Sequence, residues 1–263
     1  METFFTEKSI RLISFVGVLF IMGAWEVLFQ RKRLVDSKPK RWLNNLGLVA
    51  VDNLILQLGF VMLPVTFAAF VQSKGMGIFN QLSLPMWASW IATVIIFDFI
   101  IYLQHVLFHF VPILWRLHQV HHSDLDIDVT TAIRFHPIEI ILSLFIKLAA
   151  VAAFGFPPEA VLLFEVLLNG TAMFNHANIY IPTIIDKFIR LLTVTPDMHR
   201  VHHSVIMDES NTNFGFNLSV WDRICGTYQE QPTAGHDRMV IGLAYAKKPK
   251  SIIQLLIMPF KKN

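Results

Sequence analysis

Apolar residues run in long, nearly unbroken stretches along the first two thirds of the chain. A helix that crosses a bilayer needs about 20 mostly apolar residues. Three stretches meet that length, at residues 10–29, 46–71 and 87–107. Two more, at 138–156 and 158–174, are joined by the turn signal GFPP and are predicted to form a helical hairpin. The pattern predicts an all-α, polytopic helical bundle with about four to five membrane helices.

After residue 175 no apolar stretch is long enough to span a membrane. This part of the chain is therefore predicted to form a helical cap. Residues 184–192 and 252–260 mix apolar and charged positions at helical spacing. For both segments two readings stay open: an amphipathic helix lying on the membrane surface, or packing against the rest of the cap.

Composition supports the membrane prediction. The chain is 54% hydrophobic and 16% charged, and its mean hydropathy is +0.52; a soluble domain is usually about 45–50% apolar and 25% charged. The net charge is only +3, and the basic residues gather beside apolar stretches, which favours membrane flanks and excludes a nucleic-acid surface. Cys225 is the single cysteine, so an internal disulfide and CxxC motifs are excluded.

The distribution of Lys and Arg predicts the orientation. Residues 31–42 carry six basic side chains, whereas residues 72–85 carry one charge, Lys74. The positive-inside rule places the first segment in the cytoplasm and the second outside, with the N-terminus outside. The hairpin contains Lys147 and Glu165, so a re-entrant arrangement stays open. In either case the histidine motifs on both sides of the hairpin emerge in the cytoplasm.

Eight of the 11 histidines fall into three clusters, QHVLFH, HQVHH and HRVHH. Residues three and four apart share one face of a helix, whereas adjacent residues point about 100° apart. An HH doublet therefore suits two neighbouring metals better than one. Four ligands complete a structural zinc site, so eight clustered histidines favour a two-metal site over scattered surface histidines. The clustered residues are His105, His109, His118, His121, His122, His199, His202 and His203.

The order HxxxH, HxxHH, HxxHH resembles the fatty acid hydroxylase/sterol desaturase superfamily, the membrane-bound histidine-rich di-iron oxygenases. Further matches are RFHPIE at 134–139, NHANI at 175–179 and NFGFNLSVWDRICGTY at 213–228. The resemblance runs from about residue 98 to 228, half of the chain. It adds His176 as a ninth metal ligand. Some relatives carry another histidine four residues earlier, where this chain has Ala172.

The resemblance implies two iron ions, O2 as the oxidant, and electrons from NAD(P)H through an external carrier. That carrier would be cytochrome b5-like, or a ferredoxin with its reductase. The chain shows neither a GxGxxG fingerprint nor a CxxCH haem site, so the reductant must come from a partner protein. A nitrogen-only ligand set also accepts zinc, which can occupy the site in isolated protein.

Asp98 lies seven residues before His105, two turns along the third predicted span. An ionisable residue inside a span is a functional candidate, and we expect Asp98 to accept a hydrogen bond from a ligating histidine. The alternative is a carboxylate paired with a basic group. His136 is a weaker candidate ligand; the alternatives are that it contacts a ligating histidine or forms a hydrogen bond where the chain turns at Pro137. His236 is predicted to be solvated. Asp124, Asp128 and Glu139 are further candidate partners of the ligating histidines. Arg134 and Arg200 either hold such carboxylates or are positive-inside charges.

These expectations divide the chain into membrane helices with a basic loop (1–85), a fatty acid hydroxylase-like catalytic region (86–230) and a cytoplasmic or interfacial tail (231–263). They predict a lipid hydroxylase or desaturase, in a bacterial inner membrane, with its site facing the cytoplasm. Sterols, fatty acids, sphingolipids, alkylglycerol ethers and carotenoids all stay open as substrates. A membrane zinc hydrolase would need an HExxH motif, which is absent. A metal-handling membrane protein would line its spans with ionisable residues, whereas these histidines crowd one side.

Overall fold

The computed structural model describes residues 6–246 and 248–261, and within them all regular structure is helical, with three isolated β-bridges. This confirms the all-α prediction. The longer helices are α1 (Glu7–Leu28), α2 (Lys38–Gly59), α3 (Pro64–Ser73), α4 (Met86–Phe110), α5 (Pro112–His122), α6 (Pro137–Phe154) and α7 (Pro158–His176). The short ones are η1 (Ile78–Gln81), η2 (Thr131–Ile133), α8 (Thr183–Ile189), α9 (Pro196–His202), α10 (Met207–Ser210), α11 (Val220–Ile224), α12 (Ile252–Ile257) and η3 (Met258–Phe260).

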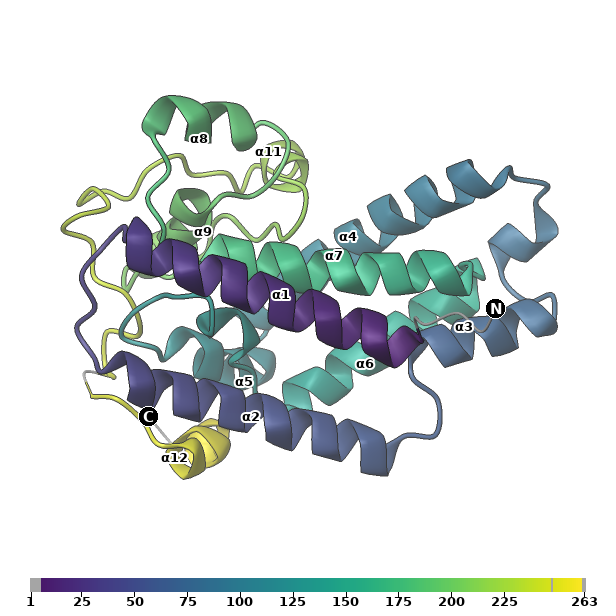
Figure 1. Cartoon of the computed structure of the whole chain (residues 1–263), viewed down its shortest axis with the longest axis horizontal. Coiled ribbons are helices and arrows are strands. Elements are labelled where there is room, and N and C mark those ends of the chain that lie inside the picture. Colours follow the sequence, from purple (N-terminus) through teal and green to yellow (C-terminus); the bar gives the residue numbers. More distant parts are fainter. Residues whose placement is uncertain (1–5, 247, 262–263) are drawn as a thin grey trace.

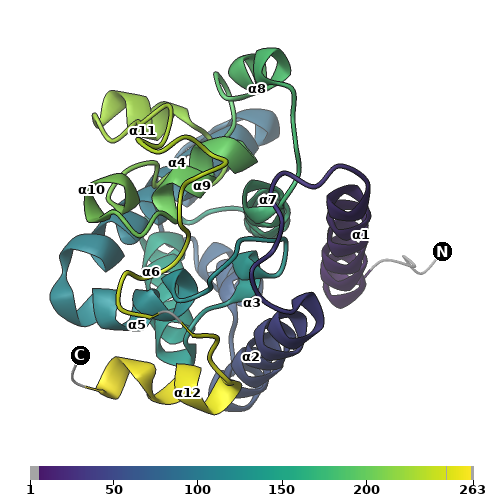
Figure 2. The same cartoon turned by 90° about the vertical axis from the view of Figure 1, so that its left-hand side faces the viewer.

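The long helices run roughly side by side along the long axis, and the short helices other than η1 form a cap at one end (Figure 1). Helix α7 is the central element, since it packs against α1, α3 and α4 and meets α9 at the cap (Figure 2). The basic loop at 31–37 and the segments that carry the histidines lie at the cap end, whereas the 74–85 connection lies at the opposite end. The three histidine clusters therefore share one end of the bundle with the basic loop.

Four segments are long and apolar enough to cross a membrane: Glu7–Leu28, Lys38–Gln81, Met86–Phe110 and Pro137–Phe154. Their outer faces remain apolar and exposed, as at Phe20 and Val27 of α1, which are 75% and 76% exposed. Such a surface fits contact with lipid chains. The fifth predicted stretch, 158–174, forms α7, which is outside this set and is enclosed by its neighbours.

The second predicted stretch, 46–71, is not one helix. Helix α2 ends at Gly59, where the N–H of Phe60 still bonds the carbonyl of Leu56, and α3 begins at Pro64. Proline has no N–H to donate and disfavours helical geometry in the residue before it. The chain therefore breaks between Gly59 and Pro64, and the two helices follow different lines (Figure 1).

The turn between α6 and α7 forms as the GFPP signal predicts. Gly155 caps α6 with φ +67, a left-handed conformation that favours glycine, and Pro158 opens α7. The loop after α3 approaches this turn so closely that a Cβ on Gly77 would lie 2.3 Å from the backbone nitrogen of Gly155. The two glycines thus let the 74–85 loop pack on the far end of the hairpin.

The two amphipathic segments are buried to different extents. In the 252–260 segment Leu255 and Met258 are buried against α2 and α5, whereas Ile253 and Phe260 are 72% and 65% exposed, so one face packs on the long helices and the other stays apolar and exposed. In the 184–192 segment Ile184 and Phe188 are 72% and 71% exposed. Helix α8 therefore leaves an apolar face uncovered at the edge of the cap.

Candidate metal centre

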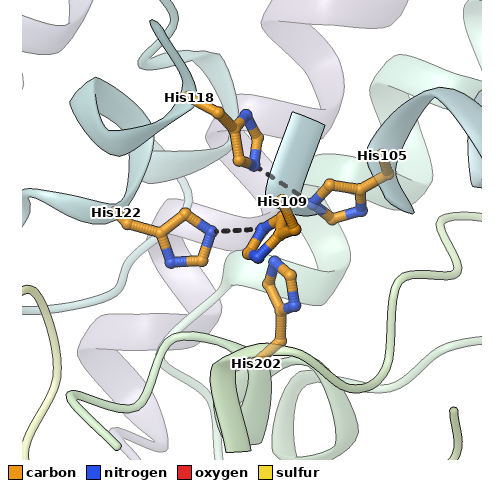
Figure 3. A group of neighbouring side chains, drawn as sticks. All are labelled: His105, His109, His118, His122 and His202. Carbon is orange, nitrogen blue, oxygen red and sulfur yellow. Dashed lines mark hydrogen bonds between the residues drawn. The ribbon is translucent and has the colours of Figure 1, made fainter. Parts of the chain in front are cut away.

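The nine histidines singled out by the sequence converge at the junction between the helices and the cap. They form a five-histidine group and a four-histidine group, and the candidate ligand atoms within each group lie within 4.8 Å of one another. All nine side chains are buried. Figure 3 shows the first group, with its imidazoles pointing toward one another. The first group contains His105, His109, His118, His122 and His202; the second contains His121, His176, His199 and His203.

Helical geometry explains how the two groups are built. His118 and His122 lie one turn apart on α5 and enter the same group, whereas the adjacent His121 points into the other. The same division separates His202 from His203 at the end of α9. Each HH doublet thus contributes one side chain to each group, as expected for two neighbouring metal positions.

Prolines start the two helices that carry the doublets. Pro112 opens α5 immediately after α4 ends at Phe110, and α5 packs back against α4. Pro196 opens α9, whose first turn is capped by Thr195. Proline suits the first turn of a helix because its missing N–H has no partner there. The sequence therefore fixes where each histidine helix begins.

The inward-facing ring nitrogens make more mutual contacts than hydrogen bonding between imidazoles can explain. The Nε2 atom of His176 lies 3.1, 3.1 and 3.2 Å from the Nε2 atoms of three other histidines, His121, His199 and His203. The carbonyl of Ala172 lies 2.7 Å from His176 Nδ1, which must therefore carry the hydrogen and leave one lone pair on Nε2. One lone pair cannot accept three hydrogen bonds.

A metal ion accounts for this spacing. Two nitrogens bound at about 2.0–2.1 Å, with bond angles between 90° and 109°, lie about 2.8–3.4 Å apart. The five-histidine group shows the same separations, 3.2 Å between Nε2 of His105 and His118 and 3.1 Å between Nε2 of His109 and His122. The residues present therefore fit one metal ion in each group.

Acceptors outside the centre hold the Nδ1 atoms of five of the nine histidines. A carbonyl, carboxylate or amide oxygen lies within hydrogen-bond distance of five Nδ1 atoms, which fixes their tautomer and turns the Nε2 lone pairs inward. The pairs are His105 with Phe214 O (2.8 Å), His109 with Asn211 Oδ1 (3.2 Å), His118 with Glu139 Oε1 (2.6 Å), His176 with Ala172 O (2.7 Å) and His202 with Thr212 O (2.8 Å).

Burial keeps these imidazoles neutral. It lowers the pKa of His118 and of His176 to about 3. Burial, and then the neighbouring imidazoles, lower the pKa of His121 and His199 well below the ordinary value. A neutral imidazole is the form that binds a metal, so the site is ready for metal at neutral pH.

Asp98 does not hold a histidine as expected. Its carboxylate accepts hydrogen bonds from the backbone and side-chain nitrogens of Asn217, from the N–H of Leu218 and from the indole of Trp221, at 2.8–3.2 Å. Among the described residues none of its hydrogen bonds involves a histidine. Asp98 instead ties α4 to the segment after α10, which carries Phe214, the carbonyl partner of His105.

Asp222 also supports the segment around Phe214, and it was not predicted from the sequence. Its carboxylate accepts hydrogen bonds from the N–H groups of Phe214 (2.7 Å) and Gly215 (2.9 Å) and from the hydroxyl of Thr227 (2.7 Å). Burial raises the pKa of Asp222 to about 6. The sequence signal that could have identified Asp222 is its position in the SVWDRICGTY stretch, which is part of the resemblance to the family. Asp222 and Asp98 together fix the irregular segment around Phe214.

The other shell candidates have distinct roles. Glu139 is the carboxylate that meets a histidine, whereas Asp124 and Asp128 pair with the buried guanidinium of Arg41 at 2.7 and 2.6 Å. Arg134 donates to the carbonyl of Val120 and so fastens the end of α5. These residues build the frame around the centre.

His136 and His236 lie outside both groups. The Nδ1 atom of His136 accepts a hydrogen bond from the N–H of Ile138 and caps α6, which confirms the reading as a turn residue beside Pro137. The prediction that His236 is solvated is wrong. It is 8% exposed and packs near Asp197, whose Oδ2 lies 3.9 Å from its Nε2.

The fold and the site define a membrane protein with a buried, histidine-rich centre at one end of its spanning helices. The sequence profile described as fatty acid hydroxylase matches residues 90–227, which include all nine histidines. This match covers half of the chain, so the protein belongs to the fatty acid hydroxylase family.

Three curated relatives show the breadth of this family. The chain is 30% identical to an ornithine lipid hydroxylase of Rhizobium tropici over 68% of this chain and 52% of the relative. It is 31% identical to the human alkylglycerol monooxygenase over 60% of this chain and 33% of the relative. It is 24% identical to a methylsterol monooxygenase of Arabidopsis thaliana over 80% of this chain and 81% of the relative. The chain thus spans about half and a third of the first two relatives. No solved structure matches it significantly.

Proposed function

We propose that the protein is a membrane-bound di-iron oxidoreductase that hydroxylates or desaturates a lipid, using O2 and electrons from a partner carrier. One observation carries the proposal: nine buried histidines form two adjoining groups at the end of the membrane helices. The family membership and the names of the relatives, which are hydroxylases and monooxygenases of lipids, support the same chemistry.

The choice of metal follows from the reaction. Bound iron would supply the redox chemistry that lets O2 attack an unreactive C–H bond, which zinc cannot supply. Hydroxylation consumes one O2, two electrons and two protons and yields the alcohol and one water. The electrons for this reaction would be delivered by an external carrier, cytochrome b5-like or a ferredoxin with its reductase.

The protein's own residues orient the histidine rings and exclude water from the site. The five His Nδ1 contacts described above orient the rings before any metal binds. Phe135 stacks on His121 with ring centroids 4.7 Å apart, and Phe216 lies 4.9 Å from His105. Phe214 contacts His105 at 5.5 Å. These aromatic side chains exclude water, and the neighbouring apolar helices can guide a lipid chain to the centre.

The orientation belongs to the same proposal. The basic loop at 31–37 and the histidine centre share one end of the bundle, and the positive-inside rule assigns that end to the cytoplasm. We place the protein in a bacterial inner membrane. A cytoplasmic centre would be accessible to a soluble electron carrier.

Metal analysis and lipid analysis of one preparation test the function. We expect about two irons per chain in protein expressed and purified anaerobically with iron, and a Mössbauer spectrum of nitrogen-ligated iron. Comparison of lipids from cells that express the wild type or the His121→Ala variant should show a hydroxylated or desaturated lipid only with the wild type. Two zinc ions and no iron after iron-loaded anaerobic expression would overturn the oxygenase assignment.

A further inference from the structure

A small pocket lies in the cap outside the histidine centre. Its volume is about 140 Å³, and none of the nine histidines lines it. The walls come from residues 32–35, 125–127 and 238–241, together with Asn178 and Arg200. The first of these segments belongs to the basic loop between α1 and α2, so the pocket lies at the cap end of the bundle.

The pocket is strongly basic. Four cationic side chains line it, those of Lys32, Arg33, Arg200 and Arg238, against a single carboxylate, Asp126. That carboxylate already accepts hydrogen bonds from two backbone N–H groups of the adjoining loop, at 2.9 and 2.8 Å. The cations are therefore not balanced within the pocket, and the excess positive charge favours an anionic ligand.

Arg200 gives the strongest indication of a ligand. Its side chain is 1% exposed, and its Nη2 atom has no hydrogen-bond partner. Its Nε atom lies 3.5 Å from Asp197, a carboxylate that is engaged more closely by Arg31 at 3.1 Å. A buried guanidinium with an unpartnered N–H nitrogen is costly. An anion in the pocket would complete its hydrogen bonds.

We propose that this pocket binds a phosphate group, supplied either by a lipid headgroup or by soluble phosphate. Arginine side chains bind phosphate oxygens through paired, charge-assisted hydrogen bonds. A volume of about 140 Å³ corresponds to four or five waters at about 30 Å³ each, which fits one phosphate group and not a whole lipid. Arg200 sits on α9 between two histidines of the metal centre, so one helix carries parts of both sites.

The test uses the full chain in detergent, with inorganic phosphate as the first probe. Phosphate is titrated against the melting temperature at constant ionic strength set by chloride. In parallel, native mass spectrometry measures retention of a phosphatidic acid and of a phosphatidylcholine control. The test variant Arg33→Gln/Arg238→Gln removes two exposed rim charges, and Arg200→Gln removes the buried one. The matched control is Lys187→Gln/Lys248→Gln, which removes two exposed charges away from the pocket.

We expect saturable binding by the wild type and the control, and an apparent Kd at least about tenfold higher in the rim variant, because charged hydrogen bonds are lost. Binding of inorganic phosphate identifies a soluble source, whereas retention of phosphatidic acid without an effect of phosphate identifies a headgroup. The rim variant keeps the test informative if Arg200→Gln fails to fold. The proposal is overturned if neither probe binds, or if the rim variant and the lysine control behave alike.

Discussion

The Nδ1 atom of His118 and the Oε1 atom of Glu139 lie 2.6 Å apart, and both side chains are buried. The contact joins the histidine helix α5 to the first turn of α6. Because the carboxylate holds the hydrogen on Nδ1, the Nε2 lone pair of His118 faces the five-histidine group. Glu139 is thus a positioning residue that acts through a ligand.

Replacing Glu139 should lower the metal affinity of the five-histidine group. In Glu139→Gln the amide oxygen can still accept the hydrogen bond, but the negative charge is gone; in Glu139→Ala both are lost. We expect metal affinity to fall about 10–100-fold in the alanine variant and less in the glutamine variant. Metal release to a chelator measures the effect, with the exposed Glu159→Gln as control. An unchanged release rate in Glu139→Ala would remove Glu139 from this role.

The spacing of the histidines predicted most of the metal centre. It did not predict which other residues hold those histidines in place. The spacings within the three clusters set which histidines share a face, so the division of His121 and His122 between two groups follows from the sequence. Asp98 and its partners, in contrast, are 119–123 residues apart in the chain. No periodic pattern connects such positions. The burial of His236 was not predicted for the same reason, because it depends on segments that are distant in the sequence.

The unequal size of the two groups predicts unequal sensitivity to mutation. Removing His122 leaves four histidines in its group, whereas removing His121 leaves three. Because four nitrogens still complete a closed site and three do not, His121→Ala should retain about one metal per chain and His122→Ala close to two.

Elemental analysis of the two variants after the same dialysis makes the comparison. His236→Gln serves as the control, since His236 is buried but belongs to neither group. Equal metal contents in His121→Ala and His122→Ala would contradict the two-group arrangement.

Asp98→Ala should destabilise the segment that supports the centre. The substitution leaves the buried donors of Asn217 and the partly buried donors of Leu218 and Trp221 without their acceptor. Since each unsatisfied buried donor costs about 1–3 kcal/mol, we expect a loss of roughly 3 kcal/mol or more in unfolding free energy. Thermal unfolding of metal-free protein separates this effect from lost metal binding. The exposed Asp208→Asn is the matched control, and an equal melting temperature for both variants would refute the role of Asp98.

Arg41 forms the most buried ion cluster that links α2 to the loop after α5. Its guanidinium is 2% exposed and reaches Asp124 at 2.7 Å and Asp128 at 2.6 Å. Arg41→Gln leaves two buried carboxylates without their cation, which typically costs about 3–5 kcal/mol. A large drop in melting temperature is expected, and Lys40→Gln, an exposed neighbour, should show none. A drop in Lys40→Gln of the same size would point to net charge as the cause.

The single cysteine allows a direct test of orientation. Cys225 is exposed and lies in the cap, whereas the exposed Lys74 lies in the loop at the opposite end. Cytoplasmic placement of the cap predicts that a membrane-impermeant maleimide labels Cys225 in inside-out vesicles and not in right-side-out ones. The variant Lys74→Cys/Cys225→Ala should show the reverse pattern. Labelling after detergent solubilisation gives the total for each protein. If both cysteines react from the same side, the two ends of the bundle do not face opposite compartments; if both patterns are reversed, the histidine centre faces away from the cytoplasm.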